Sequence, residues 1–177
     1  HRFVYQPQEL QSMQRDIGHF ARAGVTALVL GVLDTKQQID EKALALLLHA
    51  AQEASDGVQI TFHRAFDEAG DLSQSIATLG KYNTITRILT SGGKASALEA
   101  AETFPQLIQL ADQHSLSLIA GAGLTLETLG DFVCQTGIRE VHLGSAVRQQ
   151  GRIHLPLDGE RIRQARRILD EIVEQSN

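Results

Sequence analysis

The chain is poor in the residues that build disulfides and soft-metal sites. Its 177 residues include one cysteine, Cys134, and one methionine, Met13. A single cysteine excludes an internal disulfide framework and fits a reducing compartment. Both side chains fall within expected helices, where packing is their default role. Soft copper(I) prefers thiolate and thioether ligands, so these two residues are the only such donors that the sequence offers.

The chain also lacks a basic excess and long apolar runs. Its formal net charge is −5, so the composition gives no electrostatic basis for binding nucleic acid or an anionic membrane. No apolar run approaches the roughly 20 residues that a membrane-spanning helix needs. With 42% hydrophobic and 21% charged residues, the composition predicts one globular domain over residues 1–177, with one substantial core.

Hydrophobic patterning predicts five strands, each followed by a helix. A near-continuous apolar run at 25–33 indicates a strand buried on both faces, and Pro105 should divide the helical region 95–114 into two shorter helices. Such alternation is typical of an α/β fold with a parallel sheet. The expected strands are 25–33, 58–63, 85–90, 116–120 and 140–143; the expected helices are 7–24, 40–54, 71–80, 95–114 in two parts, 125–136 and one that begins at Asp158.

Two architectures fit this order of elements. An open, flavodoxin-like sheet of five strands would be complete at this length. A TIM (β/α)8 barrel normally needs at least about 200 residues, so the chain would supply its last five βα units. The sequence begins without methionine, and we expect it to be a piece of a longer protein.

Charged and polar side chains follow the apolar part of the strands. The second strand runs into His63, Arg64 and Asp67, within I-T-F-H-R-A-F-D. Ligand sites of parallel α/β folds lie at the carboxyl ends of the strands, so we take these three, with Asp34 and His142, as candidate catalytic residues. A histidine at this edge can act as a general acid or base. The alternatives are a hydrogen-bonded core histidine, a local Arg64–Asp67 ion pair that sets the loop, and a turn role for Asp34.

Glycine and serine residues follow the later strands. Glycine lets backbone amides approach a ligand closely, and in barrels the loops after the last two strands commonly hold a phosphate. We therefore predict an anion or phosphate subsite, while small residues that merely permit tight turns are the alternative. Lys94 lies beyond two glycines, where we expect it to be solvated. The predicted subsite comprises Ser91, Gly92, Gly121, Gly123, Gly144 and Ser145.

The spacing of metal-ligand residue types does not indicate a metal site. The seven histidines are scattered, and the sequence contains no H-x-H, H-E-x-x-H or C-x-x-C pattern. We therefore assign no metal ligands from the sequence.

Taken together, the strand-end motifs resemble the CutC family of copper homeostasis proteins. The resemblance implies the last five units of a TIM barrel, a cytoplasmic protein, and copper binding and copper tolerance. The cysteines credited with copper binding in that family lie on its first two strands, and Cys134 matches neither. The motifs are G-V-L-D at 31–34, T-F-H-R-A-F-D at 61–67, I-L-T-S-G-G at 88–93, A-G-A-G at 120–123 and E-V-H-L-G-S-A at 140–146.

Two functions follow from these observations. The resemblance predicts a copper homeostasis protein. The strand-end chemistry offers the alternative of a lyase or isomerase that acts on a small phosphorylated or anionic metabolite. In either case we expect a small anionic ligand. A sheet with open edges also predicts pairing with another copy of the chain or aggregation.

Overall fold

The computed structural model describes residues 3–175 and contains one sheet of five parallel strands. The strands are paired in the order β1-β2-β3-β4-β5, so each lies beside its neighbour in sequence. This confirms the α/β class and the parallel sheet. The strands are β1 (Ala27–Leu30), β2 (Gln59–Phe62), β3 (Ile85–Thr90), β4 (Ser117–Gly121) and β5 (Glu140–His142).

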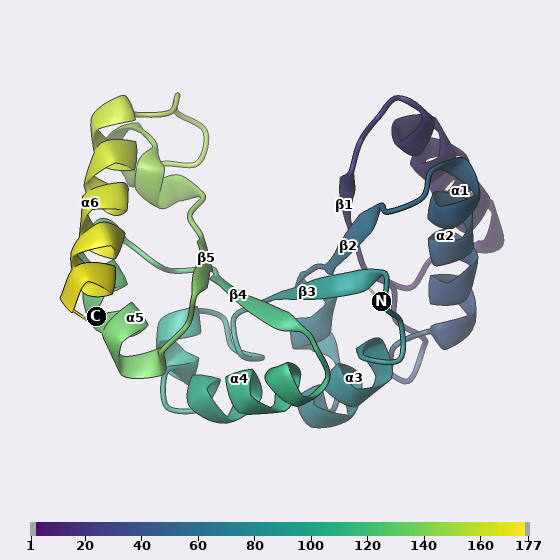
Figure 1. Ribbon diagram of the computed structural model, residues 1–177, viewed down its shortest axis with the longest axis horizontal. Helices are drawn as coiled ribbons and strands as arrows, with labels where there is room; N and C mark the ends of the chain where they lie inside the picture. Colours follow the sequence, from purple (N-terminus) through teal and green to yellow (C-terminus); the bar gives the residue numbers. More distant parts are fainter. Residues whose placement is uncertain (1–2, 176–177) are drawn as a thin grey trace.

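Helices cover the outer side of a curved sheet. In Figure 1 the strands line the inside of an open arc, with α1 and α2 at one end and α5 and α6 at the other. β1 and β5 are the edge strands of this sheet. The α-helices are α1 (Pro7–Arg22), α2 (Glu41–Ala54), α3 (Leu72–Leu79), α4 (Phe104–Gln113), α5 (Leu126–Thr136) and α6 (Gly159–Gln175).

The helices begin where the sequence places capping residues. Asp40 and Asp71 each accept a hydrogen bond from a backbone amide of the first turn, at 3.0 and 2.9 Å, which satisfies a donor that a helix leaves unpaired. Pro105 lies in the first turn of α4, after a separate 3-10 turn at Ala97–Ala100. Proline is tolerated there because its missing N–H is not needed, so the predicted division of 95–114 is confirmed.

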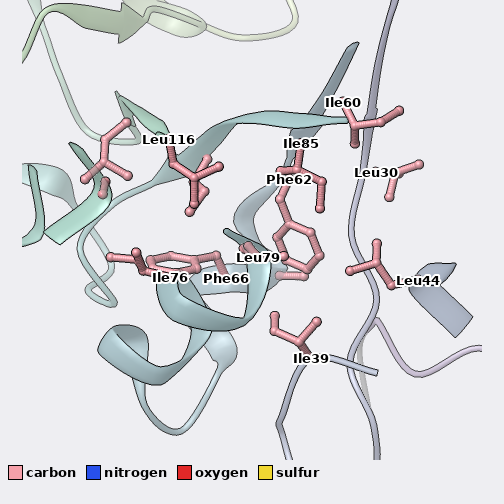
Figure 2. Packing of buried hydrophobic residues seen from close by; sticks show 14 of the residues in the cluster. Leu30, Ile39, Leu44, Ile60, Phe62, Phe66, Ile76, Leu79, Ile85 and Leu116 are labelled. Atoms are coloured by element: carbon pink, nitrogen blue, oxygen red, sulfur yellow. The ribbon is translucent and has the colours of Figure 1, made fainter. Parts of the chain in front are cut away.

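The core lies between the sheet and the helices. Ile60 and Phe62 of β2 are fully buried, as are Leu44 of α2 and Ile76 and Leu79 of α3. Figure 2 shows these side chains clustered near one another, together with Phe66 from the turn after β2. One cluster of apolar side chains extends from α1 to Ile138, and a second, smaller cluster joins α5 and α6 through Leu126, Leu129 and Ala165.

The inner face of the sheet is open, and one prediction is wrong there. Val29 of β1 is 64% exposed, although the apolar run at 25–33 predicted a strand buried on both faces. Only Leu30 of that strand is buried, because the helices cover one face and no described element covers the other. The inner face also carries an ion pair between Arg87 of β3 and Glu140 of β5, with Nε and Oε2 3.0 Å apart.

Among residues 3–175, no helix combines the length and the apolar character needed to cross a membrane.

Candidate functional site

A small hollow lies at the carboxyl ends of β4 and β5. It has a volume of about 270 Å³, slightly below the usual range of ligand pockets. The predicted site residues Arg64, Gly121, Gly123, His142, Gly144 and Ser145 all contribute to its wall. Leu89, Ala122 and Leu124 complete the lining.

The turn after β4 forms one wall and depends on close backbone contacts. Gly123 has a φ of +78°, and a Cβ atom there would lie 2.1 Å from the Oγ atom of Ser96, so only glycine fits this position. Ala122 also has a φ of +78°, which is unusual for a residue with a side chain and is typical of backbone strain held at functional sites. Its carbonyl accepts a hydrogen bond of 2.9 Å from the Ala97 amide, which anchors the turn.

The turn after β5 forms the opposite wall. His142 is the last residue of β5 and is exposed, and it pairs in register with Gly121 of β4. A Cβ atom at Gly121 would lie 3.4 Å from that of His142, so the glycine leaves room for the imidazole. Behind the turn, Arg161 of α6 donates from Nε to the carbonyl of Ala146 at 2.6 Å. The 3-10 turn Ser145–Val147 is thereby tied to α6.

Arg64 reaches the hollow from the 3-10 turn Arg64–Glu68 that follows β2. Its Nε atom donates to Asp67 at 2.7 Å, and Nη2 donates to the Ser91 hydroxyl at 2.8 Å. Nη2 also donates to the Lys94 carbonyl at 3.3 Å. These bonds hold the guanidinium in a fixed orientation, while 39% of the side chain stays exposed. Arg64 therefore combines both roles that its position suggested: it pairs with Asp67 and lines the hollow.

Asp67 is the buried centre of this network. Its side chain is 5% exposed, and it accepts hydrogen bonds from Arg64, from the Thr90 hydroxyl at 2.5 Å, and from the amides of Ser91 and Gly93 at 3.0 Å. A buried carboxylate needs such partners, because an unpaired buried charge is very costly. Asp67 thus holds the loop after β3 and orients Arg64, and it does not line the hollow.

His63 and Asp34 lie outside the hollow. His63 caps the turn after β2, with its Nδ1 atom accepting from the Ala65 amide at 3.1 Å. Its ring centroid lies 4.8 Å from that of Phe3. A Cβ atom at Gly31 would lie 2.5 Å from the same Nδ1 atom, which explains the glycine beside it. Asp34 accepts from the amides of Lys36 and Gln38 at 2.8 and 2.9 Å, the geometry of a turn residue.

The two remaining predicted subsite residues belong to the loop after β3. Ser91 is fully buried, and its hydroxyl donates to the Lys94 carbonyl. The Gly92 amide donates to Thr90 at 2.8 Å. Both shape the loop behind Arg64 and do not line the hollow. Lys94 is exposed, as expected.

Sequence reasoning missed four residues of this region, one of which is Ala122 in the lining of the hollow. Thr90 is fully buried and bridges Asp67 and Gly92, whereas its hydroxyl suggested only the end of a strand. Leu89 and Leu124 line the hollow. Neighbouring side chains of a strand point to opposite faces, and this was the available signal for Leu89. Ile88 and Thr90 are buried on one face of β3, and Leu89 points to the other.

The described side chains do not fit a copper(I) centre. Cys134 is exposed on α5 and Met13 lies on α1, at opposite ends of the arc (Figure 1). They therefore cannot share one ion, although copper(I) favours such ligands. Within residues 3–175, no three side chains of the His, Cys, Asp and Glu types are grouped closely enough to hold a metal ion.

Comparisons of the sequence and of the structure with known proteins all point to one family. The model of the CutC family matches residues 1–147. A family protein CutC of Xanthomonas campestris pv. campestris (strain 8004) is 34% identical over 157 residues, which are 87% of this chain and 62% of the relative. One from Aliivibrio fischeri (strain MJ11) is 32% identical over 157 residues, 89% of this chain and 62% of that relative.

A solved structure has the same arrangement. It is titled the putative copper homeostasis protein CutC from Streptococcus agalactiae and superposes with a TM-score of 0.72 at 32% identity. The match covers 80% of this chain and 67% of that one. The chain spans 62% of the length of the first curated relatives that it matches.

Proposed function

The chain belongs to the CutC family, and from that premise we propose that it takes part in copper homeostasis and binds a small anion in the hollow at β4 and β5. The observation that carries this proposal is the convergence of Arg64 with the turns after both strands on one small volume. The names of the relatives favour copper homeostasis over a lyase or isomerase. We also propose a cytoplasmic location, with which a chain that has a single cysteine is compatible.

Backbone amides supply the first part of the anion site. The N–H groups of Gly123 and Ser145 take no part in the loop hydrogen bonds of the described chain. Both residues line the hollow and are exposed. Free amides in tight turns form concave sites that favour negative charge, and glycine at 123 lets an anion approach without a side chain in between.

Arg64 supplies the charged part. Its Nε and Nη2 atoms are engaged by the loop, whereas Nη1 donates to no described residue. A guanidinium that is already oriented loses little conformational entropy when it binds. Asp67 offsets much of its charge, so the hollow is suited to a small anion with one charged group.

The fold supports a finer proposal about architecture. Five parallel strands in sequential order, curved with helices outside, are the pattern of a TIM barrel. We propose that the sheet is five of the eight strands of such a barrel. Its open edges are also where a second copy of the chain would pair.

Copper homeostasis in this proposal does not depend on copper ligands within residues 3–175. We expect that competition with a copper(I) chelator detects no tight site in the chain, and that Cys134→Ser and Met13→Leu leave the result unchanged. Stoichiometric copper(I) that either substitution removes would contradict this part of the proposal.

Calorimetric titration with inorganic phosphate tests the binding site. We expect Arg64→Gln to weaken binding by about tenfold or more, since a hydrogen bond to a charged group contributes about 1.5–3 kcal/mol. Ser145→Ala should weaken it less. The matched control is Arg139→Gln, an exposed arginine beyond the other end of β5. Equal effects of Arg64→Gln and Arg139→Gln, or no binding by the unaltered chain, would refute the proposal.

A further inference from the structure

An ordered loop rises beside the hollow after β5. Residues 148–157, here called the rim loop, begin and end at an antiparallel bridge between Arg148 and Leu157. The Gln149 amide donates to the Pro156 carbonyl at 3.0 Å, and Arg148 Nη1 donates to the Leu155 carbonyl at 2.9 Å. Figure 1 shows the loop above the end of β5. Its closed base fixes the loop relative to the strand that bears His142.

The rim loop presents an apolar side chain at the edge of the hollow. Ile153 is 64% exposed and stands between the polar residues Arg152 and His154, whereas Leu157, which is 59% exposed, lies at the base of the loop. A methyl group added at Gly144 would lie 3.7 Å from its Cδ1 atom. Gly144 lines the hollow, and Ile153 does not. The isoleucine therefore lies just outside the site, where a bound ligand that protrudes beyond Gly144 would meet it.

The hollow itself has apolar as well as polar walls. Leu89 of β3 is half-buried and Leu124, in the turn before α5, is buried. They lie in the same wall as Arg64, Gly123 and Ser145. Leu124 already packs in the core, whereas a bare inorganic anion would leave the half-buried Leu89 without an apolar partner in the hollow. An organic anion would contact it. A volume of about 270 Å³ admits only a small ligand.

We propose that the ligand is an organic phosphate or carboxylate with a compact apolar group, and that Ile153 is a specificity-determining residue that covers this group. The proposal rests on the proposed anion site and adds the chemical class of the rest of the ligand. The anionic group binds the amides of Gly123 and Ser145 and the Arg64 guanidinium. The apolar group contacts Leu89 and Leu124, and Ile153 shields it from water.

This division of the ligand predicts different behaviour for two probes. Inorganic phosphate uses only the polar wall, and phenyl phosphate uses both. Apolar contacts in a pocket discriminate by about tenfold or more. We therefore expect the unaltered chain to bind phenyl phosphate at least about tenfold more tightly than inorganic phosphate.

Calorimetric titrations of the full chain and two variants test the role of Ile153. Ile153→Ser should weaken phenyl phosphate about fivefold to tenfold and leave inorganic phosphate unchanged, because it removes only the apolar cover. Val173→Ser is the matched control: Val173 is 58% exposed near the carboxyl end of α6 and does not line the hollow, so this change should alter neither affinity.

The outcomes separate this inference from the proposed function. Equal affinity for the two probes, or equal losses of both in Ile153→Ser, would overturn the inference and leave the anion site standing. Failure of both probes to bind the unaltered chain would refute the anion site and the inference with it. A loss of phenyl phosphate binding in Ile153→Ser that Val173→Ser reproduces would also overturn the inference.

Discussion

Replacement of Asp67 by alanine should be among the most destabilising single changes on the carboxyl side of the sheet. The carboxylate is 5% exposed and accepts from the Arg64 guanidinium, the Thr90 hydroxyl and the amides of Ser91 and Gly93. Arg64 is 39% exposed and can regain hydration. The Ser91 amide cannot, because Ser91 is fully buried.

The expected cost follows from what Asp67→Ala leaves behind. Removal of one partner from a buried charged pair costs about 3–5 kcal/mol, and the partial exposure of Arg64 places this case near the lower end. With a slope of about 2 kcal/mol per molar urea, the midpoint of unfolding should fall by about 1.5 M. Asp67→Asn keeps the volume of the side chain. The free energy of unfolding that this variant loses therefore measures the contribution of the charge and of the second acceptor oxygen.

Urea unfolding followed by far-ultraviolet circular dichroism measures this effect. Asp112→Ala is the matched control, because Asp112 is exposed on α4 and should shift the free energy of unfolding by no more than about 0.5 kcal/mol. Hydrogen exchange should also show that the amides of Ser91 and Gly93 lose protection in Asp67→Ala. An unfolding midpoint as little changed as that of the control would refute the account of Asp67 as the buried centre of the network.

Three further changes test other parts of the structure. Gly31→Ala should destabilise the chain by about 1–3 kcal/mol through overpacking against His63, and a double-mutant cycle with His63→Ala should show that the two losses do not add; additive losses would contradict the contact. Glu140→Gln breaks a half-exposed ion pair on the inner face and should cost less than about 1 kcal/mol in urea unfolding, so a loss of several kcal/mol would show that this face is covered in solution. A hydrogen bond from Arg166 lowers the pKa of Asp170. The stability that this ion pair adds to α6 is therefore present above the ordinary carboxyl range and is lost as pH falls below about 4. Asp170→Asn should reduce the difference in thermal stability between pH 7 and pH 3, and an unchanged difference would argue against a stabilising role of the pair.

The sequence carried enough information for the order of elements and for one half of the site. The helices expected from residues 40 and 71 and the division of 95–114 at Pro105 rest on local signals, and these elements formed close to where the sequence indicated. Gly121 and Gly123 were identifiable because glycine in a turn after a strand has few roles other than tight geometry.

The rest depended on contacts between residues far apart in the chain. Nothing near His63 in the sequence revealed that Gly31 and Phe3 would lie against its ring. In the structure His63 caps the turn that follows β2 and does not line the hollow. Asp67 was visible as a charged residue at a strand end, but its burial depends on Thr90 at the end of the next strand and on Ser91 in the loop that follows. The exposure of Val29 likewise reflects which faces of the sheet the helices cover, and the apolar run alone does not specify that.

We propose that the turns after β4 and β5, together with Arg64, bind a small anion. Titration of the isotope-labelled chain with inorganic phosphate, followed by amide resonances in two-dimensional NMR spectra, tests it most directly. Anion binding at these turns predicts saturable shifts of the amide resonances of Gly123, Ser145 and their neighbours. The side-chain resonances of Arg64 should shift as well, and the amides of α1 and α2 should not. Shifts that are absent, that do not saturate, or that are confined to other parts of the chain would contradict it.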